Sequence, residues 1–444
     1  MPDLVIIASR RVVTPDGEQD GAILIRDGRI DAVVPRARIP AGAPVEDFGR
    51  LAILPGLVDP HVHVNEPGRT EWEGFDTATR AAAAGGITTL VDMPLNSTPV
   101  TTDVAALRQK LAATTGKLSV DVAFHGGLIP GNAGDLESLI DAGVVGIKAF
   151  LVHSGIDDFP NATEPDLHAA MPILARRNVP LLVHAELDGD APKAGRTYAS
   201  YLASRPRHWE NRAVRLLIRL CREFRCPVHI VHLSSSDVLD ELSAAKSEGL
   251  PLTVETCPHY LFFDAERIAE GDTRFKCAPP IREAENRERL WEGLRSGVID
   301  LIASDHSPCP PEMKRLESGD FATAWGGIAS LQLGLCAVWT QASARGLGLV
   351  DLARWMAQSP ARMVRLDSSR GAIAPGRDAN LVVFDPEARW NVSGPSLLHR
   401  HKLTPYEGVE LAGRVRATYL RGRKIYEDGR MIGSASGQPL LAPR

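Results

Sequence analysis

Short apolar segments recur along the middle of the chain, and most are separated by stretches with helical periodicity. One such stretch has apolar side chains at i, i+3, i+4 and i+7, the spacing of one face of an amphipathic helix: Val214, Leu217, Ile218 and Cys221. The apolar segments predict eight strands, which end at His63, Met93, Phe124, Phe150, His184, His232, Cys257 and Asp305. Eight strand–helix units in succession predict an α/β fold, a (β/α)8 TIM barrel.

A different pattern occupies both ends of the chain. The first 52 residues contain closely spaced β-type segments broken by Asp-Gly pairs, and similar strand-like runs return near residues 380–384 and 417–425. Closely spaced strands with such turns predict antiparallel pairing rather than strand–helix units. The two ends are therefore compatible with one small β-domain.

Length, charge and cysteine content narrow the class of protein. With 444 residues, the chain can hold a barrel of about 250 residues and a smaller second module. A formal net charge of -5 offers no general attraction to nucleic acid or an anionic membrane, so we expect a small-molecule partner. Six cysteines without a Cys-x-x-Cys pair, and no signal-peptide pattern, predict a cytoplasmic protein. No apolar run approaches the roughly 20 residues that a membrane helix needs.

Polar residues close several of the predicted strands, which are otherwise apolar. In a barrel of this type the active site lies at the C-terminal ends of the strands. The candidates at these ends are His61, His63, Lys148, His184, His232 and Asp305. Imidazoles combined with a carboxylate suit Zn, Co, Mn or Fe, so the pattern predicts a metal site.

Two of these positions leave alternatives open. A protonated Lys148 would repel a divalent cation, so it is either a structural ion-pair partner or carboxylated by CO2 to a carbamate that can bridge two metals; position alone favours the ion pair. His229 and His232 are three apart and face opposite sides of a strand, and His232 is closer to the catalytic end. Further histidines are expected near the site without binding metal: His125, His153, His259 and His306.

Several longer segments carry a family resemblance. They include residues 55–63, 66–74, 92–96, 146–148, 255–260, 278–282 and 304–314. On these segments the chain resembles the cyclic amidohydrolases of the amidohydrolase superfamily, and among them the allantoinase family. The resemblance implies a homotetramer and a β-sandwich domain formed by residues 1–52 and 373–444, with the barrel at residues 53–372.

The resemblance also implies a centre of two divalent metal ions, with Zn expected first. One ion would be held by His61, His63 and Asp305, the other by His184 and His232, and carboxylated Lys148 would bridge them. Asp305 would also be catalytic, because it could take a proton from water and pass it to the departing ring nitrogen. The implied reaction is hydrolysis of a cyclic amide.

The substrate is predicted from position 65. Dihydroorotase-like chains usually carry Arg there, which can hold a substrate carboxylate in a bidentate pair, whereas this chain has Asn65. This difference favours allantoin, which has no carboxylate, and its opening to allantoate in purine degradation. The alternatives are a hydantoinase or dihydropyrimidinase, a dihydroorotase, and a non-catalytic relative, against which the presence of all six ligand types argues. The predicted substrate contacts are Asn96, Ser307, Cys277 and Ala278.

Overall fold

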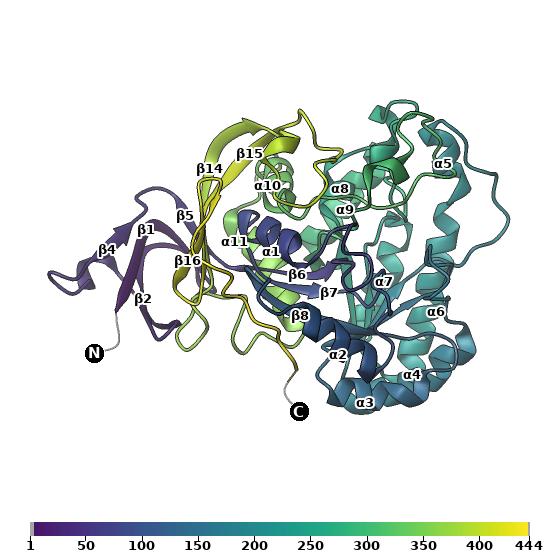
Figure 1. The fold of residues 1–444 in the computed structure, drawn as a ribbon, viewed down its shortest axis with the longest axis horizontal. Coiled ribbons are helices and arrows are strands. Elements are labelled where there is room, and N and C mark those ends of the chain that lie inside the picture. Colours follow the sequence, from purple (N-terminus) through teal and green to yellow (C-terminus); the bar gives the residue numbers. More distant parts are fainter. Residues whose placement is uncertain (1–3, 443–444) are drawn as a thin grey trace.

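A computed structural model describes residues 4–442. Its strands form two sheets, one of eight strands in the middle of the chain and one of nine strands from the two ends. In Figure 1 the end-derived sheet, purple and yellow, lies to one side of the central sheet and its surrounding helices. Within the described residues, no helix is both long and apolar enough to cross a membrane.

The central sheet is the predicted barrel. Its strands are parallel and each pairs with its neighbour in sequence, from the first to the eighth. An isolated parallel bridge between Val62 and His306 links the two edges. The strands are β6 (Leu57–Val62), β7 (Ile87–Asp92), β8 (Asp121–Gly127), β9 (Gly146–Phe150), β10 (Leu181–His184), β11 (Val228–Ile230), β12 (Leu252–Thr256) and β13 (Leu301–Ile302). All eight predicted strands are confirmed.

Helices follow most of these strands and cover the outside of the barrel (Figure 1). The predicted amphipathic helix is α6, and its four periodic apolar residues are all buried. Burying such a stripe against the sheet is what gives a barrel helix most of its stability. The helices are α1 (Phe75–Ala84), α2 (Val104–Ala113), α3 (Leu136–Asp141), α4 (Glu164–Arg177), α5 (Tyr198–Ser204), α6 (Arg207–Phe224), α7 (Leu239–Ser247), α8 (Pro258–Phe262), α9 (Ala284–Ser296), α10 (Gly334–Ser343), α11 (Leu349–Ala353) and α12 (Ser359–Met363).

The second sheet joins the two ends of the chain. The first three strands pair antiparallel, as predicted, and β5 connects them to β14, so that N-terminal and C-terminal strands lie side by side (Figure 1). The strands are β1 (Val5–Thr14), β2 (Gly17–Arg26), β3 (Arg29–Val34), β4 (Val45–Asp47), β5 (Ala52–Pro55), β14 (Leu381–Asn391), β15 (Glu410–Leu420), β16 (Arg423–Glu427) and β17 (Arg430–Met431). The predicted fold class, a barrel with a smaller β-domain built from both termini, is confirmed.

The boundaries between the two domains stay a prediction. The expected first boundary, after residue 52, falls inside β5, which pairs with β1 and β14 of the terminal sheet. Buried Asp121 at the start of β8 then ties the domains together, since it accepts from Arg421 at 2.5 Å and pairs with Arg370 at 2.9 Å. This ion cluster fixes the terminal domain at the N-terminal end of the barrel strands, away from the ends where catalysis is expected.

Candidate active site

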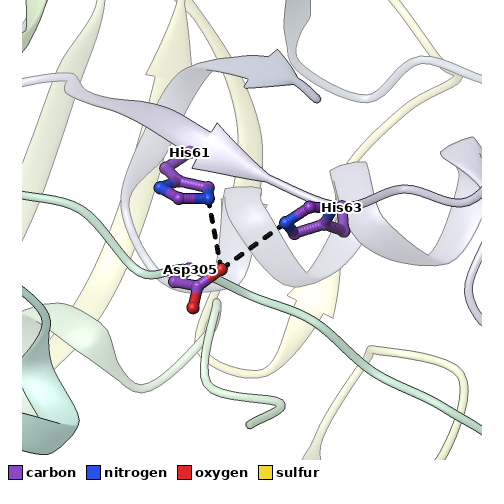
Figure 2. A group of neighbouring side chains, drawn as sticks. All are labelled: His61, His63 and Asp305. Atoms are coloured by element: carbon purple, nitrogen blue, oxygen red, sulfur yellow. Dashed lines mark ion pairs between the residues drawn. The ribbon is translucent and has the colours of Figure 1, made fainter. Parts of the chain in front are cut away.

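Two histidines at the end of β6 and an aspartate after β13 form a compact buried cluster. His61 Nε2 lies 3.2 Å from Asp305 Oδ1, and His63 Nε2 lies 3.6 Å from the same oxygen (Figure 2). One ligand atom from each residue falls within 4.8 Å of the other two, so a single metal ion could be held by all three. The strand period places His61 and His63 on the same face, which is why both reach Asp305.

The other three candidates face the same cavity. The rings of His184 and His232 have centroids 4.6 Å apart, and His232 lies 5.4 Å from the His61 ring. Lys148 lines the cavity together with these histidines and with Asp305. The cavity has a volume of about 460 Å³, enough for a small cyclic substrate. The structure therefore brings all six predicted residues together.

Lys148 is buried without the partner that a structural lysine needs. Its ammonium nitrogen makes no hydrogen bond and no ion pair to any residue in the described part of the chain. Burial lowers the pKa of Lys148 to about 8, so the neutral amine that reacts with CO2 is accessible near neutral pH. Because no carboxylate among the described residues lies within ion-pair distance of Lys148, the ion-pair alternative lacks support.

The donor atoms around the cavity fit a bound metal group. His61 Nε2, His232 Nδ1 and Lys148 Nζ are all buried and have no hydrogen-bond partner among the described residues. Buried polar atoms are normally paired, because leaving one unpaired costs about 1–3 kcal/mol. Three unpaired buried nitrogen atoms around one cavity are the pattern expected of residues that bind a metal ion.

Hydrogen bonds fix the ring orientation of three histidines. His61 Nδ1 donates to Glu255 Oε1 at 2.5 Å, and His63 Nδ1 donates to the carbonyl oxygen of Leu95 at 3.0 Å. His184 Nε2 donates to Glu186 Oε2 at 2.7 Å, and Glu186 is in turn held by Arg205. In each ring the other nitrogen keeps its lone pair free, which is the arrangement that metal-binding histidines use.

Glu255 is a functional candidate that the sequence analysis did not identify. Besides His61, its Oε1 accepts from the backbone N–H of His232 at 3.1 Å, and its Oε2 accepts from His229 Nε2 at 3.0 Å. One buried carboxylate on β12 therefore orients two candidate ligands. The sequence did contain a signal for this role, because Glu255 is an acidic residue inside an otherwise uncharged strand. A carboxylate buried in such a strand requires several hydrogen-bond donors around it.

Of the other histidines near the site, only one lines the cavity among the described residues. His229 packs between Thr253 and Glu255 and does not line the cavity. His153 lines the cavity, whereas His125 and His259 are buried and outside its lining. His306 Nε2 lies 3.4 Å from Glu73 Oε2, and its Nδ1 accepts from the backbone of Ser330. His306 thus supports the backbone next to Asp305, and it is absent from the cavity lining.

Two of the six candidates have a strained backbone. His232 has φ +39° and Asp305 has φ +44°, in the left-handed region that residues with a Cβ rarely adopt. Asn65, after the second histidine, has φ +67°. Such strain costs about 1–3 kcal/mol per residue and is retained where the surrounding structure requires it, frequently at functional sites.

The predicted substrate contacts divide into two groups. Asn96, Ser307 and Ala278 line the cavity. The Ser307 hydroxyl, however, already donates a hydrogen bond to the backbone carbonyl oxygen of Asp305 at 2.7 Å. Cys277 does not line it: the residue is buried, and its carbonyl oxygen accepts from Tyr201 at 2.6 Å. The Asn65 side chain accepts from Asn96 Nδ2 at 3.2 Å, so position 65 supports Asn96.

Comparisons with known proteins point to one family. A model of the Amidohydrolase family matches residues 52–425. An allantoinase of Streptomyces avermitilis is 49% identical over 430 residues, which is 96% of each chain. An allantoinase of Arabidopsis thaliana is 44% identical and covers 98% of this chain and 90% of its own. Among solved structures, an L-hydantoinase (dihydropyrimidinase) from Arthrobacter aurescens has a TM-score of 0.92 at 30% identity, covering 99% of this chain and all of its own.

Proposed function

Because the chain belongs to the amidohydrolase family, we propose that it hydrolyses the ring of allantoin to give allantoate, a step of purine degradation. The observation that carries the proposal is the convergence of four histidines, Lys148 and Asp305 on one small cavity. The allantoinases of Streptomyces avermitilis and Arabidopsis thaliana match this chain over nearly its whole length, which supports this choice of substrate.

The proposed cofactor is a pair of divalent metal ions, with Zn the first candidate. His61, His63 and Asp305 would hold one ion, and His184 and His232 the other. Lys148, carboxylated on its unpaired amine, would bridge the two, since a carbamate has two oxygens and carries the negative charge that an ammonium lacks. When bound, such ions lower the pKa of water and polarise a carbonyl group.

The chain itself supplies the proton transfer. Burial raises the pKa of Asp305, but the adjacent His61 and His63 outweigh it and hold that pKa well below its usual value. The carboxylate is therefore ionised and able to accept a proton from the attacking water. When the ring opens, the same carboxyl can give that proton to the departing nitrogen, which would otherwise leave as a poor anion.

Two related substrates are the main alternatives. The L-hydantoinase similarity favours a hydantoin or dihydropyrimidine ring, which would use the same centre. Dihydroorotate is disfavoured because the buried Asn65 is committed to Asn96 and offers no guanidinium for a carboxylate. The homotetramer and the cytoplasmic location stay predictions.

Allantoate formation and its dependence on metal test the proposal. The zinc-loaded protein should convert allantoin to allantoate, a chelator-treated sample should lose this turnover, and added Zn should restore it. The product is identified by NMR, so that ring opening is distinguished from loss of the side chain. Metal-loaded protein that leaves allantoin unchanged would contradict the proposed function.

Glu255→Gln should weaken metal binding by about 10- to 100-fold, the range found when a group that orients a ligand is removed. The amide keeps the volume of the carboxylate but carries no charge and places an N–H group among donors. The zinc affinity, measured by competition with a chelator, reports the effect. Asp264→Asn is a matched control, because it changes a buried carboxylate whose partner, Arg287 at 2.7 Å, is not a candidate ligand. Equal zinc affinity in Glu255→Gln and wild type would refute the positioning role.

A further inference from the structure

Lys276 places a cation in the cavity wall. Its ammonium donates to the carbonyl oxygen of Ala324 at 2.6 Å and lies 3.4 Å from that of Ala322. It also lies 5.4 Å from the centre of the Tyr201 ring. All four residues line the cavity. The side chain therefore sits where a bound molecule would meet it.

Lys276 forms no ion pair with any residue in the described part of the chain. The carboxylate that acts on its charge, that of Asp320, lies beyond ion-pair distance. Its three ammonium hydrogens have one strong and one long carbonyl partner, which leaves donor capacity toward the cavity. Burial and the nearby Lys314 and Arg205 lower the pKa of Lys276 to about 8. A hydrogen-bond acceptor that enters the cavity would therefore be strongly attracted to the Lys276 ammonium group.

The backbone of Lys276 is held rigidly. Its carbonyl oxygen accepts from the backbone N–H of Gly327 at 2.9 Å and from the Lys314 ammonium at 3.1 Å. The facing loop is fixed too, because Trp325 donates to the carbonyl of Met313 at 2.8 Å. A donor on a fixed backbone loses little entropy on binding, which is the condition for a specific contact.

Lys276 is placed to contact a part of the substrate other than the scissile amide. The scissile amide must lie at the cluster of His61, His63 and Asp305, whereas Lys276 reaches the cavity from the segment after α8, which contributes none of the six candidate residues. The charged groups that act most on it are Lys314, Arg205 and Asp320, none of which is in the six-residue cluster. Resting on the proposed function, we infer that Lys276 is a specificity-determining residue that donates a hydrogen bond to the ureido carbonyl of allantoin. Hydantoin lacks this group.

The test compares kcat/KM for allantoin and hydantoin in the metal-loaded wild type and in Lys276→Met. Methionine keeps the length and the apolar stem but has no donor. We expect kcat/KM for allantoin to fall about 10- to 100-fold, the range for a hydrogen bond from a charged group, while hydantoin changes less than about threefold. Lys276→Gln keeps one neutral donor and should give an intermediate loss, which also provides a second variant if the methionine protein does not fold.

Lys193→Met is the matched control. Lys193 is an exposed lysine outside the cavity lining, so its loss reports the general effect of removing one charge and should alter both substrates by less than about threefold. Equal losses on allantoin and hydantoin in Lys276→Met would mean that Lys276 only holds the loop, and would overturn the inference; so would no loss. A wild type that opens hydantoin but not allantoin would overturn the proposed function and this inference together.

Discussion

Lys148→Ala should lose most of its bound metal and more than about 1000-fold in turnover, because several kcal/mol of transition-state stabilisation would depend on the proposed metals. The structure supports this expectation: the amine is buried in the cavity wall, its pKa is lowered by burial to about 8, and it has no carboxylate partner among the described residues. Metal content per chain and kcat, measured on the same samples, report the result.

Lys148→Met separates the bridging role from packing. Methionine restores most of the lost volume and keeps an apolar stem beside Phe150, but it cannot form a carbamate. If Lys148 bridges two metals, the methionine and alanine variants should lose metal and turnover to the same extent. A methionine variant that keeps two metals per chain and near-normal turnover would reduce Lys148 to a packing residue.

Asp305→Asn should lower kcat by at least about 100-fold while most of the metal remains, because general acid–base catalysis contributes about that much. The amide keeps one oxygen near His61 and His63, which can still bind a cation, but it is a far weaker base. The rate should therefore fall much further than the metal content.

A parallel measurement of metal and rate distinguishes the two roles of Asp305. A fall in rate that merely follows a fall in metal would leave Asp305 as a ligand alone. An asparagine variant with full metal and undiminished turnover would contradict both its proton transfer and its place in the site.

The barrel and its strand-end residues were predictable because they depend on local periodicity. Alternation along β6 puts His61 and His63 on one face, and strand–helix repetition brings the ends of β9, β10, β11 and β13 to the same edge. Neither inference requires knowledge of packing. The choice of His232 over His229 follows from the same alternation, and the structure places them accordingly.

The supporting contacts were not predictable in the same way. Glu255 reaches His61 across 194 positions of sequence, and no local pattern indicates that pairing. Lys148 was ambiguous because only the packed structure reveals which charges surround it. Cys277 was expected to contact substrate, but whether a backbone carbonyl faces a cavity or a tyrosine depends on how the loops pack.

Steady-state kcat/KM on allantoin, hydantoin, dihydrouracil and dihydroorotate, with the zinc-loaded protein, tests the proposed function most directly. We predict that allantoin gives the highest value, because its ureido group can accept a hydrogen bond from Lys276. Allantoin also has no carboxylate, which suits a site with Asn65 at the position where dihydroorotase-like chains carry an arginine. A highest value for dihydroorotate would contradict the argument from position 65, and a highest value for hydantoin or dihydrouracil would replace allantoin as the substrate.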